Sequence, residues 1–387
     1  MSRGWEGVAI ACPVTIPYAR ACERSAHWWL GRALAELLRA SGLPKSAIDG
    51  LIATSFTLGP DTSVALAEHF GLAPRHIDWL PTGGASGVMA LRRAARAVQA
   101  GDADVVACIA GDTARPGAFA DLVAYFSRFS REAVHPYGAA GPNLPFALIT
   151  EYYLRTTGTP PEALAAIPIA ARANAAANPN ALLRDKPLDL ARWALSPMIV
   201  DPLRRDDCVM PCAGAEGFLV LAQDRARHLS LPHATLSASI ERHNAYADDS
   251  VATRGGWAMD RDALWAQAGL SPRDMDIVQT YDDYPVIVAM QFEELGLCPA
   301  GEGGRFAAAT DLRVGGGLPH NTGGGQLGQG QAGAAGGFVG VVEALRQLTR
   351  QPLGCQVEEC RTAIVSGYGI VNFDRCVASA AAVLEAA

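Results

Sequence analysis

Apolar residues recur along the chain with two different periods, and the two periods alternate. Residues 25–40 and 87–100 carry apolar side chains at helical spacing, and the first of these runs ends at Gly42, as helices often do. The same spacing predicts helices at 61–70, 146–157, 161–177 and 338–348, and short apolar runs at 7–11, 77–80 and 105–110 predict buried strands. Alternating strands and helices indicate an α/β fold with a mostly parallel or mixed sheet covered on both faces.

This pattern occurs twice. GLPKSAID at 42–49 is echoed by GLSPRDMD at 269–276, and each copy follows an apolar helix and precedes a strand-like run. VVACIAGD at 105–112 likewise matches TAIVSGYG at 362–369. Two copies of one α/β unit are expected to pack back to back. We therefore predict a first half at 1–118 that ends with 203–245, a cap insertion of helices and loops at 119–202, and a second half at 246–387.

The segment WLPTGGASGVMA at 79–90 predicts a sharp turn from a strand into a helix. The apolar run breaks at Gly83 and Gly84, and a helical pattern begins near Ser86. Such an elbow presents backbone N–H groups and the positive end of a helix to a ligand. Many acyl-transfer enzymes hold a nucleophile at this kind of turn. Here the segment contains no cysteine, and Gly84 stands at its centre.

Composition excludes several classes of function. The 387 residues are 50% hydrophobic and carry a formal charge of −7 without basic runs, which argues against nucleic-acid binding and against disorder. There is no signal-like leader and no stretch of eighteen apolar residues, so we expect a cytoplasmic protein without a membrane partner. Nine scattered cysteines without a CxxC motif argue against a disulfide framework or a zinc site, and we predict no metal.

Several longer segments resemble the sterol-carrier-protein-type branch of the thiolase superfamily, over nearly the whole chain. They are PYGAAGP (136–142), RANAAANPNA (172–181), DPLRRDDCVMPCAGAEGFLVL (201–221), YDDYPVIVAMQFEELGLCPAGEGGRF (281–306) and LPHNTGGGQLGQGQAGAAGG (318–337). This resemblance implies a five-layer αβαβα thiolase fold, a homodimeric core and an acyl-coenzyme A substrate. Coenzyme A would be part of the substrate, with no tightly bound cofactor.

The positions that carry chemistry in that family are mostly replaced. Gly84 stands at the place of the elbow cysteine, and Gln331 stands where the GHP-type segment has histidine. Tyr281 takes the place of the Asn or His of the NEAF/HDCF-type segment, and Tyr368 stands beside the position of the C-terminal cysteine. Covalent acyl transfer through a thiolate at the elbow is therefore excluded.

This set of replacements resembles the thiolase-fold aldolases of steroid and bile-acid side-chain degradation, which cleave a carbon–carbon bond of a β-hydroxyacyl-coenzyme A without a nucleophile. Retro-aldol cleavage needs a base, an acid and stabilisation of an enolate. The resemblance also implies a small OB-fold, zinc-ribbon partner protein. The candidate catalytic residues are Tyr281, Tyr368, Asp282, His320 and Asn321, and the candidates for binding substrate or coenzyme A are Gly84, Ser86, Tyr284, Gln331 and Tyr137.

Structural and functional alternatives remain beside this hypothesis. Tyr281 and Tyr284 could be packing residues at a strand end, and His320 could be an ordinary loop histidine. Asp282 could cap the helix expected near Pro285. The chain could also be a thiolase or acyltransferase that uses Ser86 as its nucleophile, or a non-catalytic subunit that binds acyl-coenzyme A.

Overall fold

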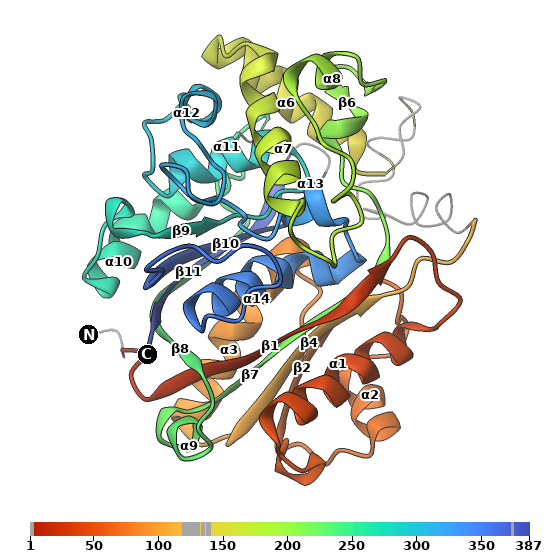
Figure 1. Cartoon of the computed structure of the whole chain (residues 1–387), viewed down its shortest axis with the longest axis vertical. Helices are drawn as coiled ribbons and strands as arrows, with labels where there is room; N and C mark the ends of the chain where they lie inside the picture. The colour runs from red at the N-terminus through yellow and green to blue at the C-terminus, as the bar shows by residue number, and fades with distance from the viewer. Residues whose placement is uncertain (1–3, 118–131, 133–135, 137–140, 252, 373–374) are drawn as a thin grey trace.

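The computed structural model describes the chain except residues 1–3, 118–131, 133–135, 137–140, 252 and 373–374 (Figure 1). Among the described residues, nine strands are hydrogen-bonded in one continuous sheet, in which β1 of the first half pairs with the first strand of the second half through residues 9–11; the parts on either side of this joint are called the first and the second sheet. The first sheet has the order β3-β2-β4-β7-β1. In it β2 is parallel to β3 and β4, whereas β7 is antiparallel to β4 and β1. These strands are β1 (Val8–Ala19), β2 (Gly50–Thr54), β3 (His76–Trp79), β4 (Val105–Asp112) and β7 (Ala213–Ala222).

The second half repeats this arrangement in the order β8-β11-β10-β9. Here β9 is parallel to β10, and β11 is antiparallel to both β10 and β8, as in the corresponding pairs of the first sheet. The internal repeat predicted from the sequence is therefore confirmed. The strands are β8 (His233–His243), β9 (Ile277–Gln279), β10 (Thr362–Asn372) and β11 (Arg375–Ala386). The expected boundary at 246 falls after β8, which pairs with β11 along its length and lies in the second sheet.

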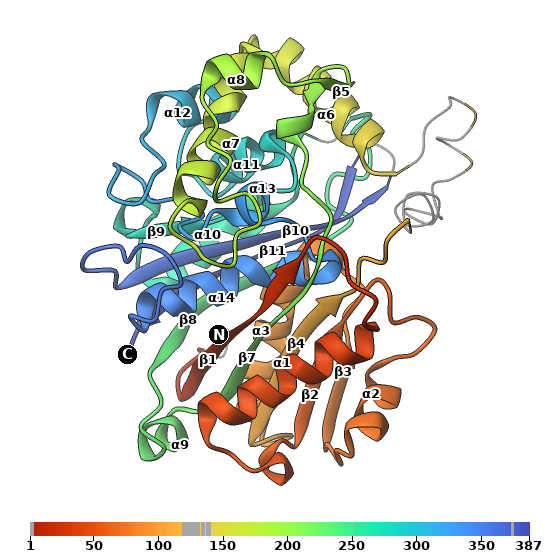
Figure 2. The same cartoon turned by 45° about the vertical axis from the view of Figure 1, so that its right-hand side comes forward.

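The helices and the two sheets form five layers, as the resemblance implied. On the outer face of the first sheet lie α1 (Ala26–Ser41) and α2 (Ser63–Phe70). Between the sheets run α3 (Ser86–Ala100) and α14 (Gly336–Leu348), and the outer face of the second sheet is covered by α10 (Trp257–Ala268) and α11 (Pro285–Glu294) (Figure 2). α3 and α14 touch at Gly87 and Gly337, where a side chain on Gly87 would collide with the Gly337 carbonyl oxygen.

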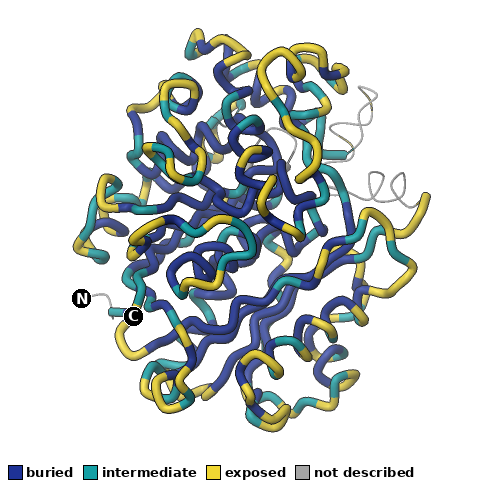
Figure 3. Tube along the Cα trace, viewed as in Figure 1, coloured by how far each residue is buried: buried dark blue, intermediate teal, exposed yellow. Residues whose placement is uncertain are grey.

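Alternation along the strands explains this layering. In β4, Val106 and Cys108 face the helices between the sheets, whereas Val105 and Ala107 face α1. Successive side chains of a strand point to opposite faces, so a strand that is apolar throughout is buried on both sides. Figure 3 shows the buried trace following both sheets and α14.

The cap packs on the second half through its helices. It contains α6 (Asn143–Thr157), α7 (Pro161–Ala175), α8 (Leu190–Ala194) and the short strand β5 (Met198–Val200), which pairs with β6 (Leu203–Arg204) just beyond the expected end of the cap. Beneath α7 lie α12 (Gly303–Ala309) and α13 (Gly325–Gln329), and α9 (Gln223–His228) links β7 to β8. No helix among the described residues has both the length and the apolar character needed to cross a membrane.

One strand is longer than predicted. The short run expected at 7–11 extends to Ala19, although the segment contains Pro13 and Pro17. The pairing of β1 with β7 shifts register between Ala11 and Val14 and again after Ile16. Bulges of this kind accommodate proline, which cannot donate to the strand ladder, so the strand continues past both residues.

Candidate active site

The elbow connects β3 to α3 through a single turn of 3-10 helix, Gly83–Ala85. Gly83 has a φ of 54°, a left-handed conformation that glycine adopts without strain. The second half has the same device at Gly333, also with a φ of 54°, at the start of the 3-10 turn that leads into α14. The backbone of the elbow is therefore retained in both copies of the fold.

The space above Gly84 is filled by a tyrosine. A Cβ added to Gly84 would collide with the ring atoms Cε2 and Cζ of Tyr281 and with the carbonyl oxygen of Tyr368. The Tyr281 ring therefore occupies the volume into which a side chain at the elbow would project. No residue larger than glycine fits at position 84 while Tyr281 keeps this place.

Tyr281 is clamped through its backbone. It follows β9, and its N–H donates to Ser366 O at 3.1 Å and to Gln291 Oε1 at 3.2 Å. Gln291 Nε2 returns a hydrogen bond to Tyr281 O at 2.8 Å, and Ser366 Oγ donates to Gln291 Oε1 at 2.6 Å. Gln291 is fully buried in α11, so these bonds fix the ring of Tyr281 above the elbow.

The hydroxyl of Tyr281 receives a hydrogen bond from Gln331 Nε2 at 3.1 Å. Burial, and then the neighbouring carboxylates of Asp283 and Asp282, raise the pKa of Tyr281 well above its ordinary value. The phenol therefore keeps its proton at neutral pH and releases it only to a strong base, such as an enolate.

Two buried aspartates follow Tyr281 in the chain. Asp282 accepts from the backbone N–H of Gln326 at 2.8 Å, and burial raises its pKa to about 7 despite this bond. Asp282 thus caps α13, not the helix near Pro285 that the sequence suggested; Tyr284 precedes that helix, α11. Asp283 lies beside Tyr281, and burial together with the charge of Asp282 raises its pKa well above the ordinary range. Among the described residues, Oδ1 of Asp283 has no hydrogen-bond partner.

His320 and Asn321 hold the loop that carries Tyr281. Asn321 accepts from Thr280 N at 2.9 Å and donates to Thr280 O at 3.1 Å. His320 Nε2 lies 2.8 Å from Thr280 Oγ1, and its ring packs edge-on against Phe292. Burial lowers the pKa of His320 to about 3, so the imidazole is neutral. Both residues therefore support the position of Tyr281 through the preceding residue.

Four other candidates point elsewhere or lie outside the described residues. The Tyr368 ring packs against Trp257 and Phe146, and its carbonyl oxygen faces the elbow at Gly84. Tyr284 stacks on Phe146 with ring centroids 4.0 Å apart, and its hydroxyl donates to Asn143 Oδ1.

Ser86 is fully buried, and its Oγ faces Gly337 of α14, away from the Tyr281 ring that covers Gly84. Tyr137 is outside the described residues.

Sequence reasoning missed two members of this cluster, Asp283 and Gln326. The adjacent acidic pair in TYDDYP was a signal for Asp283, but only the first aspartate was chosen. Gln326 lies in the glycine-rich segment that the family motif covers, and nothing in that spacing indicates that its side chain turns toward Asp282 and Gln331. Among the described residues, no group of three or more His, Cys, Asp or Glu side chains could hold a metal ion.

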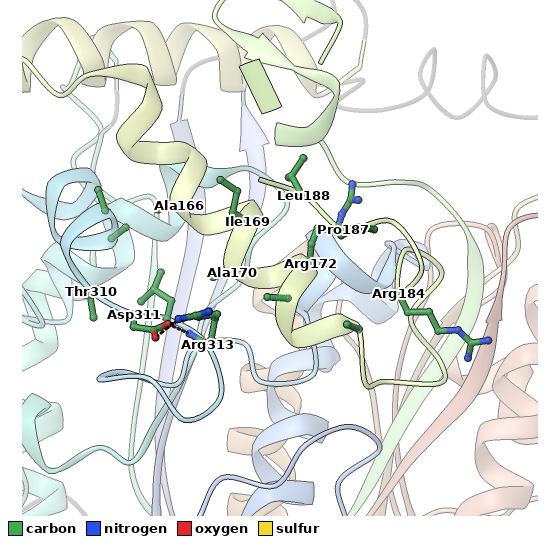
Figure 4. A pocket seen from close by; sticks show the side chains of 15 residues that line it. Ala166, Ile169, Ala170, Arg172, Arg184, Pro187, Leu188, Thr310, Asp311 and Arg313 are labelled. Atoms are coloured by element: carbon green, nitrogen blue, oxygen red, sulfur yellow. Dashed lines mark hydrogen bonds and ion pairs between the residues drawn. The ribbon is translucent and has the colours of Figure 1, made fainter. Parts of the chain in front are cut away.

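A separate surface cavity of about 460 Å³ lies between α7 and the segment around α12 (Figure 4). Arg172, Arg184 and Arg313 line it together with alanines of α7. Arg313 is paired with Asp311 at 2.7 Å, Arg172 with Asp206 at 3.0 Å and Arg184 with Asp185 at 3.4 Å, so all three charges are already balanced. The cavity shares no lining residue with the elbow and the Tyr281 cluster.

Comparison with known proteins gives consistent matches. Residues 238–382 match a family model described as thiolase C-terminal domain-like. The 17-hydroxy-3-oxo-4-pregnene-20-carboxyl-CoA lyase of Mycobacterium tuberculosis is 30% identical over 338 residues, which are 82% of this chain and 84% of that protein. The steroid side-chain-cleaving aldolase of Thermomonospora curvata is 28% identical, over 85% of this chain and 87% of that one. A solved structure, the Ltp2-ChsH2(DUF35) aldolase, has a TM-score of 0.85 and 26% identity, and the match covers 98% of both chains.

Proposed function

The chain belongs to the thiolase superfamily, in its sterol-carrier-protein-type branch, and from this membership we propose that it is an acyl-coenzyme A-dependent aldolase. It cleaves the bond between Cα and Cβ of a β-hydroxyacyl-coenzyme A and releases a ketone and a shorter acyl-coenzyme A. The names of two relatives, a steroid-carboxyl-CoA lyase and a steroid side-chain-cleaving aldolase, support a steroid side-chain thioester as the substrate.

One observation carries this proposal: the ring of Tyr281 fills the side-chain volume above Gly84. Thiolase chemistry requires a nucleophile at the elbow, and here that volume holds a phenol. A phenol beside two buried carboxylates is an acid–base group, not an acyl carrier. Cleavage without a covalent acyl-enzyme is the reaction that such a group supports.

The proposed proton transfers balance within this cluster. In its ionised form, the carboxylate of Asp283 is a stronger base than an ordinary aspartate because burial raises its pKa, and it takes the proton of the β-hydroxyl group. The Cα–Cβ bond breaks, the ketone forms, and the electron pair passes to the thioester as an enolate. Tyr281 then donates its phenolic proton to Cα, and the proton held by Asp283 returns to Tyr281. No proton is gained or lost over the cycle.

The other candidates have supporting roles in this scheme. We assign Asn321 and His320 to holding Thr280, and Asp282 to capping α13 beside the reaction site. The backbone N–H of Gly84 lies at the elbow before the N-terminus of α3 and suits the enolate oxygen, whereas the N–H of Ser86 already donates to Gly83 O within the 3-10 turn. Coenzyme A enters as part of the substrate.

We further propose that the chain forms a homodimeric core and works with a small OB-fold, zinc-ribbon protein. β3 is an edge strand of the first sheet with half-buried residues, which suits pairing with a second copy. The solved relative's name couples the aldolase to a DUF35 component, which supports a partner of that kind.

The direct test is turnover of a steroid β-hydroxyacyl-coenzyme A by the purified chain, both alone and with a DUF35 protein. The molecular mass of each assembly in solution is measured first, so that its oligomeric state is known. We expect the ketone and the shorter acyl-coenzyme A in equal amounts. Tyr281→Phe should lower kcat by about 10²–10⁴-fold, the usual contribution of a positioned acid or base.

The matched control is Tyr152→Phe, which removes a hydroxyl from α6 in the cap and should keep full activity. Absence of both products in every assembly would contradict the aldolase proposal. Full activity of Tyr281→Phe would remove this residue from the mechanism and leave the reaction itself standing.

A further inference from the structure

Gln331 contacts the hydroxyl of Tyr281, and its own orientation is fixed by a chain of polar contacts. Its Nε2 lies 3.1 Å from Tyr281 Oη and 3.1 Å from Gln326 Oε1. An amide nitrogen has two N–H groups, and the two acceptors account for both. The Gln331 amide therefore faces the phenol as a donor.

Gln326 is in turn held in one orientation by Asp282. Its backbone N–H donates to Asp282 Oδ1 at 2.8 Å, and its Nε2 lies 3.5 Å from the same oxygen. Because the nitrogen side of the amide faces the carboxylate, Oε1 faces Gln331. A side chain on Gly336, at the start of α14, would collide with Gln326 Oε1, so this glycine makes room for the amide.

The backbone of Gln331 is also pinned. Its N–H donates to Met210 O at 2.8 Å, and its carbonyl accepts from Cys212 N at 2.9 Å. Gln331 thus has two fixed ends: the backbone on the segment that precedes β7, and the amide on Gln326. Such preorganised donors stabilise a charge that develops during a reaction because they need not reorient.

We propose that Gln331 is a positioning residue whose amide, oriented by Gln326 and Asp282, directs one N–H at the Tyr281 oxygen and stabilises the phenolate left after proton donation. This inference rests on the proposed function, because it concerns the acid of that reaction. It reassigns Gln331 from binding substrate to acting through Tyr281. A donor to the phenolic oxygen makes the phenol a stronger acid, in agreement with the lowering effect of Gln331 on the pKa of Tyr281.

The test uses Gln331→Leu in the full chain with any partner needed for activity. We expect kcat to fall about 10–100-fold, the usual effect of removing a hydrogen bond to a charged oxygen, with KM nearly unchanged. The alkaline limb of the kcat profile, which reports the Tyr281 acid, should move to higher pH. Other titratable groups near the phenol are Asp282, Asp283 and Tyr284, and this substitution changes none of them.

The same substitution made in a Tyr281→Phe enzyme distinguishes action through Tyr281 from a general structural role of Gln331. In Tyr281→Phe enzyme, Gln331→Leu should cause no further loss of kcat, because the amide acts only through the missing hydroxyl. Gln331→Asn, which keeps an amide donor, should recover part of the lost activity. Gln326→Leu should lower kcat in the same direction, and its effect should not add to that of Gln331→Leu.

The possible outcomes are distinguishable. An unchanged pH profile with a raised KM would return Gln331 to substrate binding and overturn the inference, as would an equal loss in the Tyr281→Phe background. If Tyr281→Phe behaves as expected and Gln331→Leu is fully active, the inference fails while the aldolase proposal stands. If the wild-type chain makes neither product, the proposed function fails first.

Discussion

At the scale of single residues, Gly84 and Tyr281 depend on each other through one shared volume. Gly84→Ala places a methyl group against the Tyr281 ring and the Tyr368 carbonyl, and the rigid clamp from Gln291 leaves the ring little room to move. We expect a loss of about 1–3 kcal/mol in the free energy of unfolding, as for overpacked cores, and a clear fall in kcat. Urea unfolding and the aldolase assay measure the two effects.

Gly317→Ala is the matched control, because a Cβ there meets no atom within 4 Å. It should leave stability and turnover close to those of the wild-type chain. If Gly84→Ala matched this control in both stability and turnover, the Tyr281 ring would be able to move aside at little energetic cost. The steric argument would then fail.

The sequence located several members of the site but not their geometry. Gly84, Tyr281, Asp282 and Gln331 could be identified because each replaces or neighbours a motif position. Their directions depend on packing that no motif records: Asp282 turns toward α13, and the ring of Tyr368 turns away into an aromatic cluster. Asp283 was missed because adjacent residues of an extended segment usually face opposite ways, and here both are buried.

At the scale of elements, the duplicated halves share an aspartate that anchors a strand. Asp49 accepts from the backbone N–H of Asp104 and Val105 at the start of β4, and Asp276 accepts from Arg361 and Thr362 at the start of β10. Asp49→Ala and Asp276→Ala should each lower the free energy of unfolding by about 1–3 kcal/mol, because two strand amides lose their acceptor.

Chemical denaturation of the two variants checks this expectation. Replacement of Asp102, an exposed neighbour of the first anchor, by alanine is the control and should have little effect. If Asp49→Ala and Asp276→Ala lowered the free energy of unfolding by very different amounts, the two halves would not be equivalent at this position.

Most helices and central strands follow directly from periodicity, since α1, α3 and β4 end within two residues of the predicted runs. The exceptions have physical causes. β1 was predicted too short because its prolines lie at register shifts, and α13 was missed because a five-residue helix preceded by Gly324 in a left-handed conformation has no sequence period of its own.

At the scale of the whole molecule, buried carboxylates link stability to pH. Burial raises the pKa of Glu216 to about 7, although Thr15 and Tyr18 donate hydrogen bonds to it. Between the unfolded pKa near 4.3 and this folded value, only the folded chain keeps the proton. Glu216 therefore makes the protein less stable as pH rises through this window, and the effect is complete above it.

The comparison of Glu216→Gln with the wild-type chain isolates this contribution. From about pH 5 to about pH 8 the wild-type chain should lose about 1–3 kcal/mol more unfolding free energy than the variant. Asp207 and Asp282, with pKa values raised to about 6 and about 7, act in the same direction, whereas His320 opposes them at lower pH; all three are present in both proteins. Glu302→Gln, which changes an exposed carboxylate, should keep the wild-type dependence.

The shared volume of Gly84 and Tyr281 also limits how such a chain can change over evolutionary time. A cysteine introduced at position 84 alone would collide with the ring, and a small residue introduced at position 281 alone would leave a hole and remove the acid. Each single step passes through a protein that can perform neither reaction, so the two positions must change together. Across an alignment of relatives, the residue types at these two positions should therefore covary, with a large aromatic residue at one only where glycine occupies the other.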